Sequence, residues 1–278
     1  MPKIITEDMI EQAAMKALQE RHDYTDLNCM TEDPDTLPDR TGRTDKKQVV
    51  LLDVMFDCLC RINPDIPTET VRTVAEDLCR TPLSGDLMLT NYHNYQKIRN
   101  GITVEYNKNG KKTSNILHLI AYDDVQKNSF IVASQMWIKG ETHWRRPDLI
   151  IFINGFPIVF IELKNSNIPV KNAYDINLKN YLKDIPYLFN YNQICVLSNG
   201  METRLGSFAA GYEFFFEWLK VESEKENPDR KAIRENCTSL EYFVAGLCEP
   251  KNLLDYIENF ILYDRRRTKI IAKNHQFF

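Results

Sequence analysis

Residues 145–165 read RRPDLIIFINGFPIVFIELKN. Leu149 to Ile153 and Ile158 to Ile161 are almost continuous runs of β-branched and aromatic residues, a pattern typical of strands buried on both faces of an α/β sheet. Between them, Asn154-Gly155 tolerates positive φ and closes a tight hairpin. The stretch therefore predicts two neighbouring central strands of an α/β fold.

Three charged side chains stand at the outer ends of these strands: Asp148, Glu162 and Lys164. An ionised group at the end of a buried strand is costly unless it is paired or holds a metal. Glu162 and Lys164 are two residues apart, so strand alternation puts both on one face. A strict two-residue turn would leave Asp148 on the opposite face. We therefore expect an irregular turn through residues 155–157, or a distorted strand start at Pro147, that brings Asp148 beside Glu162.

The chemistry that fits these groups is metal-dependent phosphodiester hydrolysis. Two carboxylates, a backbone carbonyl and waters suit Mg²⁺, for which Mn²⁺ can substitute. We expect Asp148 and Glu162 to bind the metal. Lys164 would orient or deprotonate the attacking water, or stabilise charge on the phosphate. The alternative is structural, with a Glu162–Lys164 or Arg146–Asp148 ion pair that caps the hairpin.

These motifs resemble the PD-(D/E)XK nuclease superfamily. The order Arg-Pro-Asp, strand, Asn-Gly-X-Pro, strand, Glu-Leu-Lys is similar to the N-terminal nuclease domain of the restriction (R) subunit of type I restriction-modification enzymes. Residues 25–115 show much weaker likeness. The resemblance runs from about Leu117 to the C-terminus through Gln135, Asn154-Gly155, 173–181, 191–193, 198–200, Arg204, Gly206, Trp218 and His275-Gln276.

The resemblance implies a mixed central β-sheet flanked by helices and a magnesium-dependent endonuclease that cuts double-stranded DNA in defence against foreign DNA. It also implies that modification and specificity subunits recognise the target in the full-length enzyme, while an ATP-driven motor pulls the DNA in. No Gly-X-X-X-X-Gly-Lys-Ser/Thr phosphate loop is present in this sequence, so we expect ATP to be used only by the full-length subunit.

A first helix is predicted over Thr6 to Leu18, with Thr6 as its N-cap and two acids in its first turn. The resemblance makes Glu11 on this helix a further candidate metal or water ligand. The alternative for Glu11 is a solvated helix face.

A second helix is predicted over Lys171 to Lys183. Relatives have a Gln-X-X-X-Tyr motif here that supports the catalytic centre or the DNA, and this chain has Asn177 and Tyr181 at those positions. The alternative is an ordinary amphipathic helix with Tyr181 half-buried.

Arg145 and Arg146 are candidate contacts to DNA phosphate, although arginines at a strand entrance pair with surface carboxylates at least as often.

The remaining pattern predicts helices near residues 48–63 and 68–79, a hairpin over 102–121, strands at 130–138 and 193–198, and an edge strand or turn at 203–206. Residues 31–43 are turn formers and predict an exposed loop. The tail is expected to be helical at 240–247 and 253–263, followed by a basic run at 265–269 that is solvated or contacts DNA or a neighbouring domain. We expect a nuclease domain at 1–215, with helical decoration at 25–100, and a helical linker at 216–278 that leads toward an absent ATPase motor domain.

Composition narrows the class of protein. The chain has 278 residues and a net charge of −4, so any DNA contact must be local or supplied by partners. Its seven scattered cysteines and the lack of a membrane-spanning run or signal peptide predict a cytoplasmic protein with reduced thiols.

Two rival functions stay open: a non-catalytic DNA-clamping or subunit-docking module that keeps the nuclease fold, and a stand-alone repair or junction-resolving nuclease.

Overall fold

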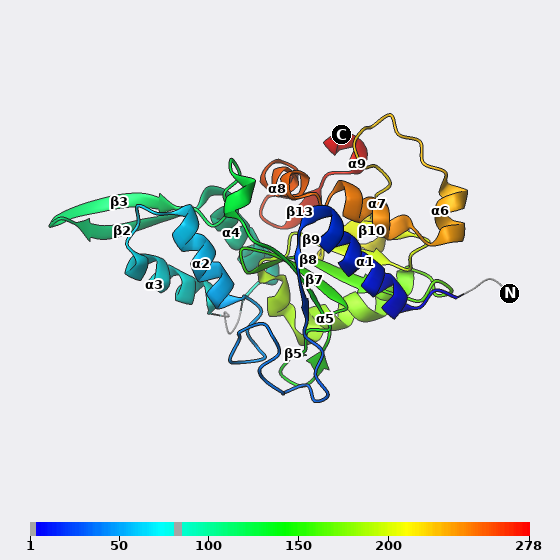
Figure 1. The fold of residues 1–278 in the computed structure, drawn as a ribbon, viewed down its shortest axis with the longest axis horizontal. Coiled ribbons are helices and arrows are strands. Elements are labelled where there is room, and N and C mark those ends of the chain that lie inside the picture. The colour runs from blue at the N-terminus through cyan, green and yellow to red at the C-terminus, as the bar shows by residue number, and fades with distance from the viewer. Residues whose placement is uncertain (1–3, 81–84) are drawn as a thin grey trace.

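A seven-stranded mixed sheet forms the centre of the computed structural model, which describes residues 4–80 and 85–278 (Figure 1). Its strand order is β1-β4-β7-β8-β9-β10-β11. The pairs β1/β4 and β8/β9 are parallel and the other neighbours are antiparallel, which confirms the predicted mixed sheet. The strands are β1 (Thr25–Asn28), β4 (Phe130–Ser134), β7 (Leu149–Ile153), β8 (Phe156–Leu163), β9 (Ile194–Ser198), β10 (Thr203–Gly206) and β11 (Phe216–Glu217).

Helices flank this sheet, and the first of them contacts β1, β4 and β8 while packing beside α7 (Figure 1). Its predicted cap is present, because the Thr6 side chain accepts a hydrogen bond from the Met9 amide. The helices are α1 (Glu7–His22), α2 (Leu52–Ile62), α3 (Thr68–Cys79), α4 (Leu87–Asn100), α5 (Lys179–Asp184), α6 (Arg230–Asn236), α7 (Ser239–Gly246), α8 (Pro250–Asn259) and α9 (Asn274–Phe277), with a π-helix at Ala173–Leu178 and 3-10 turns at Val125–Lys127, Pro186–Asn190 and Tyr212–Phe214.

Three two-stranded sheets complete the fold: β2 (Ile102–Lys108) with β3 (Lys111–Leu117), β5 (Ile138–Lys139) with β6 (Trp144–Arg145), and β12 (Ile261–Asp264) with β13 (Thr268–Ile271). The β2–β3 hairpin projects from the body at one end (Figure 1). Among the described residues, none of the helices combines the length and the apolar character needed to cross a membrane.

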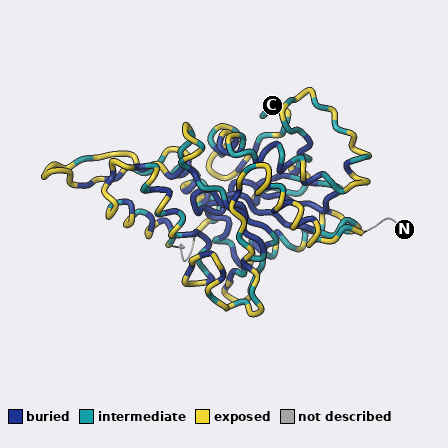
Figure 2. Tube along the Cα trace, viewed as in Figure 1, coloured by how far each residue is buried: buried dark blue, intermediate teal, exposed yellow. Residues whose placement is uncertain are grey.

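The central strands β7 and β8 are buried along their whole length, as their composition predicts. Figure 2 shows the buried residues gathered along the central sheet, with exposed residues on the helices and on the projecting hairpin. The core also extends into the C-terminal segment. For example, Phe243, Tyr256 and Ile271 belong to the same hydrophobic cluster as the sheet.

The β7–β8 hairpin keeps a regular two-residue turn, contrary to the irregular turn that we expected through residues 155–157. Asn154 and Gly155 have φ values of 50° and 80°, and Ile153 pairs with Phe156. The Asn154 side chain fixes the turn, because its amide group donates to the Leu119 carbonyl (2.9 Å) and to Asn128 Oδ1 (2.8 Å). The register breaks one residue beyond the expected place. Ile151 pairs with Val159 while Phe152 pairs with Pro157, so Ile158 is the extra residue of a β-bulge.

Gly155→Ala is expected to destabilise the chain by roughly 3 kcal/mol or more. A Cβ at this position would lie 2.5 Å from the Leu51 carbonyl oxygen, which is backbone and cannot move aside easily. The matched control is Gly110→Ala in the β2–β3 turn, where φ is 77° but no atom lies within 4 Å of the added carbon. That variant is expected to lose only about 1 kcal/mol, the cost of the left-handed backbone alone. Equal losses in urea unfolding would contradict the close packing of the β7–β8 turn.

Two other expectations need correction, and one helix has no counterpart among the predictions. The predicted strand at 130–138 ends at Ser134, because Gln135 has a φ of 56° and leaves the sheet. Helix α4 was not predicted. The tail is not helical throughout, since α8 ends at Asn259 and residues 261–271 form the β12–β13 hairpin, with the basic run in its turn and second strand. The β-branched and aromatic residues of this hairpin outweigh the helical spacing.

Candidate active site

Asp148 and Glu162 face each other across the ends of β7 and β8. Leu149 pairs with Ile161, so the next step along both strands puts Asp148 opposite Glu162. Without the bulge at Ile158 the two carboxylates would lie on opposite faces of the sheet. Asp148 Oδ2 accepts a hydrogen bond from the Leu163 amide at 2.7 Å, which fixes its carboxylate at the end of β8.

Glu162 is a buried carboxylate with one oxygen left without a donor. Its side chain is 2% exposed, and its Oε1 accepts from Lys164 Nζ at 2.8 Å. Its Oε2 has no hydrogen-bond partner among the described residues. Burial, followed by the charge of Asp148, raises the pKa of Glu162 to about 8, and burial raises the pKa of Asp148 to about 6. Both carboxylates are therefore protonated more easily than exposed ones, because burial disfavours their charged form.

The Lys164 ammonium lies between acidic groups. Its Nζ is 2.8 Å from Glu162 Oε1 and 3.9 Å from Glu7 Oε1, and it donates to the Leu163 carbonyl. Burial works to lower the pKa of Lys164, but the Glu162, Glu7 and Asp148 carboxylates together outweigh it and the net shift is upward. Lys164 is therefore a hydrogen-bond donor at neutral pH and cannot accept a proton in this arrangement.

Glu11 points into the same region from α1 and does not lie on a solvated helix face. It is 4% exposed, and the Gln135 side-chain amide donates to its Oε2 at 2.5 Å. Burial raises the pKa of Glu11 to about 7, and the nearby charge of Asp148 adds to this rise. Gln135 also reaches Asp148 directly, because its backbone amide donates to the Asp148 carbonyl at 3.0 Å.

The start of α1 is tied to the end of β8 by two residues that sequence reasoning missed. The Glu7 amide donates to Asn165 Oδ1 (2.9 Å), and the Ile5 amide donates to Ser166 Oγ (3.0 Å). Asn and Ser are common capping residues, and these two follow Glu-Leu-Lys directly, which is the signal that could have indicated them. The contacts explain why Glu11 faces the strand ends.

Tyr181 borders the site, and Asn177 lies four residues before it on the preceding π-helix. The Tyr181 hydroxyl donates to the Arg146 carbonyl at 2.9 Å, and its ring packs edge-on against Phe160. Burial, together with the charge of Glu162, raises the pKa of Tyr181. Asn177 is half-buried in the π-helix at Ala173–Leu178, and within the described residues its side chain makes no hydrogen bond. Tyr181 is thus the motif residue that contacts the backbone beside the site, and the supporting role of Asn177 stays a prediction.

Arg145 and Arg146, the two candidate DNA contacts, make different interactions. Arg145 Nε donates to Asp184 Oδ2 at 2.7 Å, so it pairs with a carboxylate, as the alternative to a DNA contact expected, although the Asp184 side chain is buried and not at the surface. The Arg146 guanidinium lies 4.9 Å from the centre of the Trp137 ring. Its charge partly opposes the burial-driven rise in the pKa of both Asp148 and Glu11, so Arg146 lies near the carboxylate cluster.

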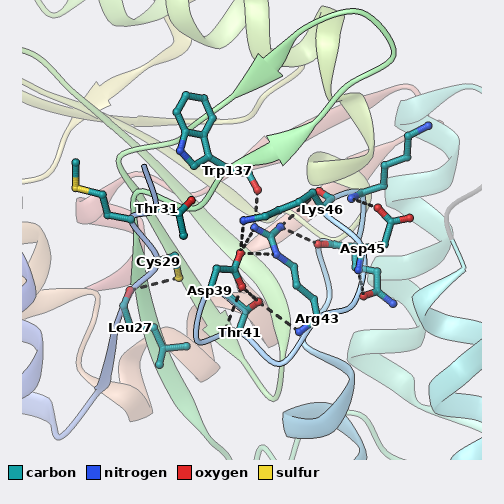
Figure 3. A network of polar contacts seen from close by, with 12 residues as sticks. Leu27, Cys29, Thr31, Asp39, Thr41, Arg43, Asp45, Lys46 and Trp137 are labelled. Carbon is teal, nitrogen blue, oxygen red and sulfur yellow. Dashed lines mark hydrogen bonds and ion pairs between the residues drawn. The ribbon is translucent and has the colours of Figure 1, made fainter. Parts of the chain in front are cut away.

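A buried ionic network holds the segment that carries Trp137 (Figure 3). Asp39 accepts from Arg43 Nη2 (2.5 Å) and Lys46 Nζ (2.8 Å), and all three side chains are at most 3% exposed. Arg43 also donates to the Trp137 carbonyl at 2.5 Å. Burial works to raise the pKa of Asp39, but its hydrogen bonds lower it to about 2. The loop at 31–43 is therefore not exposed throughout, because Asp39, Thr41 and Arg43 are buried.

The donor set at the strand ends fits a hard cation. Within residues 4–80 and 85–278, no three Asp, Glu, His or Cys side chains are gathered closely enough to form a complete metal site by themselves. The fit rests instead on the Glu162 oxygen that lacks a donor and on Asp148 opposite it, since ionised oxygens are the ligands that Mg²⁺ takes together with waters.

Comparison with known proteins shows which family this chain is similar to. The family described as "Type I restriction enzyme R protein N terminus" matches residues 4–214. The chain is 32% identical to the type I restriction enzyme HindI endonuclease subunit of Haemophilus influenzae over 85% of this chain and 23% of the relative. It is also 32% identical to the putative MjaIXP endonuclease subunit of Methanocaldococcus jannaschii, over 87% of this chain and 24% of the relative.

The chain spans about a quarter of the length of these two relatives. A more distant similarity links it to the type I restriction enzyme EcoprrI endonuclease subunit of Escherichia coli, with 27% identity over 58% of this chain and 50% of the relative. Because the family match covers most of the chain and includes every residue of the carboxylate cluster, this protein belongs to the family of type I restriction enzyme R protein N-terminal domains.

Proposed function

We propose that this chain is the nuclease part of a type I restriction enzyme R subunit and cleaves double-stranded DNA with Mg²⁺. The observation that carries the proposal is the buried Glu162 carboxylate, which has one oxygen without a hydrogen-bond donor and stands opposite Asp148 in the strand register, with Lys164 beside it. Relatives named as endonuclease subunits support a restriction nuclease role. The predicted PD-(D/E)XK motif corresponds here to Asp148, Glu162 and Lys164.

In this proposal Asp148 and Glu162 hold the metal, and Glu11 supplies a ligand directly or through water. A bound Mg²⁺, or Mn²⁺ in its place, would lower the pKa of a coordinated water and offset charge on the scissile phosphate. The Lys164 ammonium orients the attacking water or donates to a phosphate oxygen. Tyr181 holds the Arg146 backbone, and the Arg146 guanidinium lies where it can contact a DNA phosphate.

The partners follow from the family and are part of the proposal. In the full-length enzyme, modification and specificity subunits would recognise the target, and an ATP-driven motor would deliver the DNA. ATP would not bind to residues 1–278, which lack a phosphate loop. The division into a nuclease domain at 1–215 and a linker at 216–278 stays a prediction.

The proposal is tested by plasmid cleavage with a full-length R subunit that contains this chain, assembled with its partner subunits, ATP and Mg²⁺. Asp148→Ala is expected to lose cleavage and to keep assembly. The control is Glu20→Ala, which removes a carboxylate that is 64% exposed on α1. An Asp148→Ala enzyme that still cuts at the parent rate would contradict the proposal and favour the docking-module alternative.

Metal affinity is expected to rise at least about tenfold between pH 6 and pH 8. The pKa values of about 6 for Asp148 and about 8 for Glu162 mean that a metal must displace protons at lower pH. The measurement is Mn²⁺ calorimetry in buffers of different ionisation enthalpy, which reports the protons released. An affinity that does not change with pH would contradict ligation by these carboxylates.

A further inference from the structure

The Ile158 bulge is held from outside the β7–β8 hairpin. Its carbonyl accepts from the Gln193 amide at 2.7 Å and from the Asn192 side-chain amide at 3.2 Å. These two residues stand just before β9, and the parallel pairing of β8 with β9 begins at the next step, Val159 with Ile194. The register that puts Asp148 opposite Glu162 therefore depends on where Asn192 lies.

Asn192 is in turn held by two segments that are not part of the central sheet. Its carbonyl accepts from Lys269 Nζ on β13 at 2.6 Å and from the Asn91 side-chain amide on α4 at 2.8 Å. Tyr263 on β12 holds the Asn91 side chain in place, because its hydroxyl donates to Asn91 Oδ1 at 2.6 Å. Asn91, Asn192 and Lys269 are each at most 3% exposed.

Lys269 is an unusual residue at this depth. Within the part of the chain that the structure describes, no carboxylate pairs with it, and burial lowers its pKa well below the usual value. A buried amine without a counter-ion is costly, and an apolar side chain would fill the space beside the Phe208 and Tyr263 rings as well. What an apolar side chain could not do is donate to the Asn192 carbonyl.

We propose that Lys269 is a positioning residue for the nuclease site, which acts through the Asn192 carbonyl on the Ile158 bulge and so keeps Asp148 opposite Glu162. This inference rests on the proposed function. Lys269 lies outside residues 4–214, the part that matches the family, so the C-terminal hairpin contributes to a site that its own residues do not line.

Lys269→Met tests the link, because methionine keeps much of the stem and removes the amine. The control is Tyr95→Phe, which removes a hydroxyl that donates to the Ile257 and Ile261 carbonyls at the base of the same hairpin but does not contact Asn192. We expect Lys269→Met to weaken Mn²⁺ binding to the 278-residue chain at least tenfold. It should also speed hydrogen exchange at the Gln193 amide, with neither change in Tyr95→Phe.

The two readouts separate the possible failures. Gln193 exchange reports the bulge whether or not a metal binds. Exchange that is unchanged in Lys269→Met, or equally faster in Tyr95→Phe, would overturn the positioning role. A parent chain that binds no Mn²⁺ would overturn the proposed function itself.

A second variant, Asn192→Ala, covers the case in which Lys269→Met does not fold. It removes one donor to the Ile158 carbonyl and leaves the backbone carbonyl that Lys269 contacts. It is expected to weaken Mn²⁺ binding to a similar degree. In the double variant the two losses should not add, because both act on the same bulge. Fully additive losses would mean that Lys269 and Asn192 act independently, which contradicts the proposal.

Discussion

Replacing Glu162 with glutamine is expected to abolish divalent-metal binding and to lower DNA cleavage by roughly a thousandfold or more. Glutamine keeps the shape of the side chain and an oxygen that can accept from Lys164, but it removes the negative charge that would hold the metal. Cleavage is measured with the assembled full-length enzyme, and metal binding with the 278-residue chain. A Glu162→Gln chain that binds Mn²⁺ as tightly as the parent would contradict the assignment.

The same substitution is expected to stabilise the metal-free chain at pH 8 by about 1–3 kcal/mol. The folded-state pKa of Glu162 is raised from 4.5 to about 8, so the folded chain retains a proton that the unfolded chain loses. The loss of folding stability that Glu162 causes therefore grows as pH rises from about 4.5 toward 8. Glutamine cannot ionise, so the Glu162→Gln variant does not suffer this loss. Urea unfolding at pH 5 and pH 8 checks this, with Glu20→Gln as the exposed control.

This stability measurement also separates the two interpretations of the Glu162–Lys164 contact. If the pair were only a structural cap on the hairpin, removing the charge would destabilise the chain most at pH 8, where both groups would be ionised. A gain in stability at pH 8, together with loss of metal binding, is the combination that a metal site requires. A loss of stability at pH 8 would support the structural alternative.

Lys164→Met is expected to lower the rate of cleavage of bound DNA by roughly a hundredfold or more while Mn²⁺ affinity falls only a few-fold. The Lys164 ammonium contacts Glu162 and is not itself a metal ligand, so its removal should affect the reaction more than the binding of the ion. Single-turnover cleavage by the assembled enzyme measures the rate, and calorimetry on the 278-residue chain measures the Mn²⁺ affinity.

The control for Lys164 is Lys16→Met, which removes an ammonium that is 70% exposed on α1. It is expected to leave both quantities unchanged. A Lys164→Met enzyme with the parent rate but weak metal binding would mean that the lysine stabilises the carboxylates and has no part in the reaction.

The core of the site could be predicted from sequence because its determinants are local. The apolar runs, the Asn154-Gly155 turn and the charged strand ends lie within about twenty residues, and strand alternation alone shows that the register must break. The position of the break could not be predicted. It depends on Leu119 and Asn128, which fix the turn, and on Asn192, which holds Ile158 from a later part of the chain.

Other features of the fold and the site could not be predicted, because they depend on contacts between segments that are distant in the sequence. Glu11 faces the site because Asn165 and Ser166 anchor the start of α1. The loop at 31–43 is partly buried because Arg43 reaches the Trp137 carbonyl. Lys269 in the C-terminal hairpin reaches the Asn192 carbonyl, 77 residues away along the chain. Each of these contacts joins segments far apart in the sequence, so a local pattern could indicate one partner but not the pairing.

The most direct test of the central claim is Mn²⁺ calorimetry at pH 8 on the 278-residue chain and its Asp148→Ala variant, with Glu20→Ala as control. We expect the parent and Glu20→Ala to bind Mn²⁺ and Asp148→Ala to show no binding, because the metal needs the carboxylate opposite Glu162. Binding that is unchanged in Asp148→Ala would contradict the two-carboxylate site.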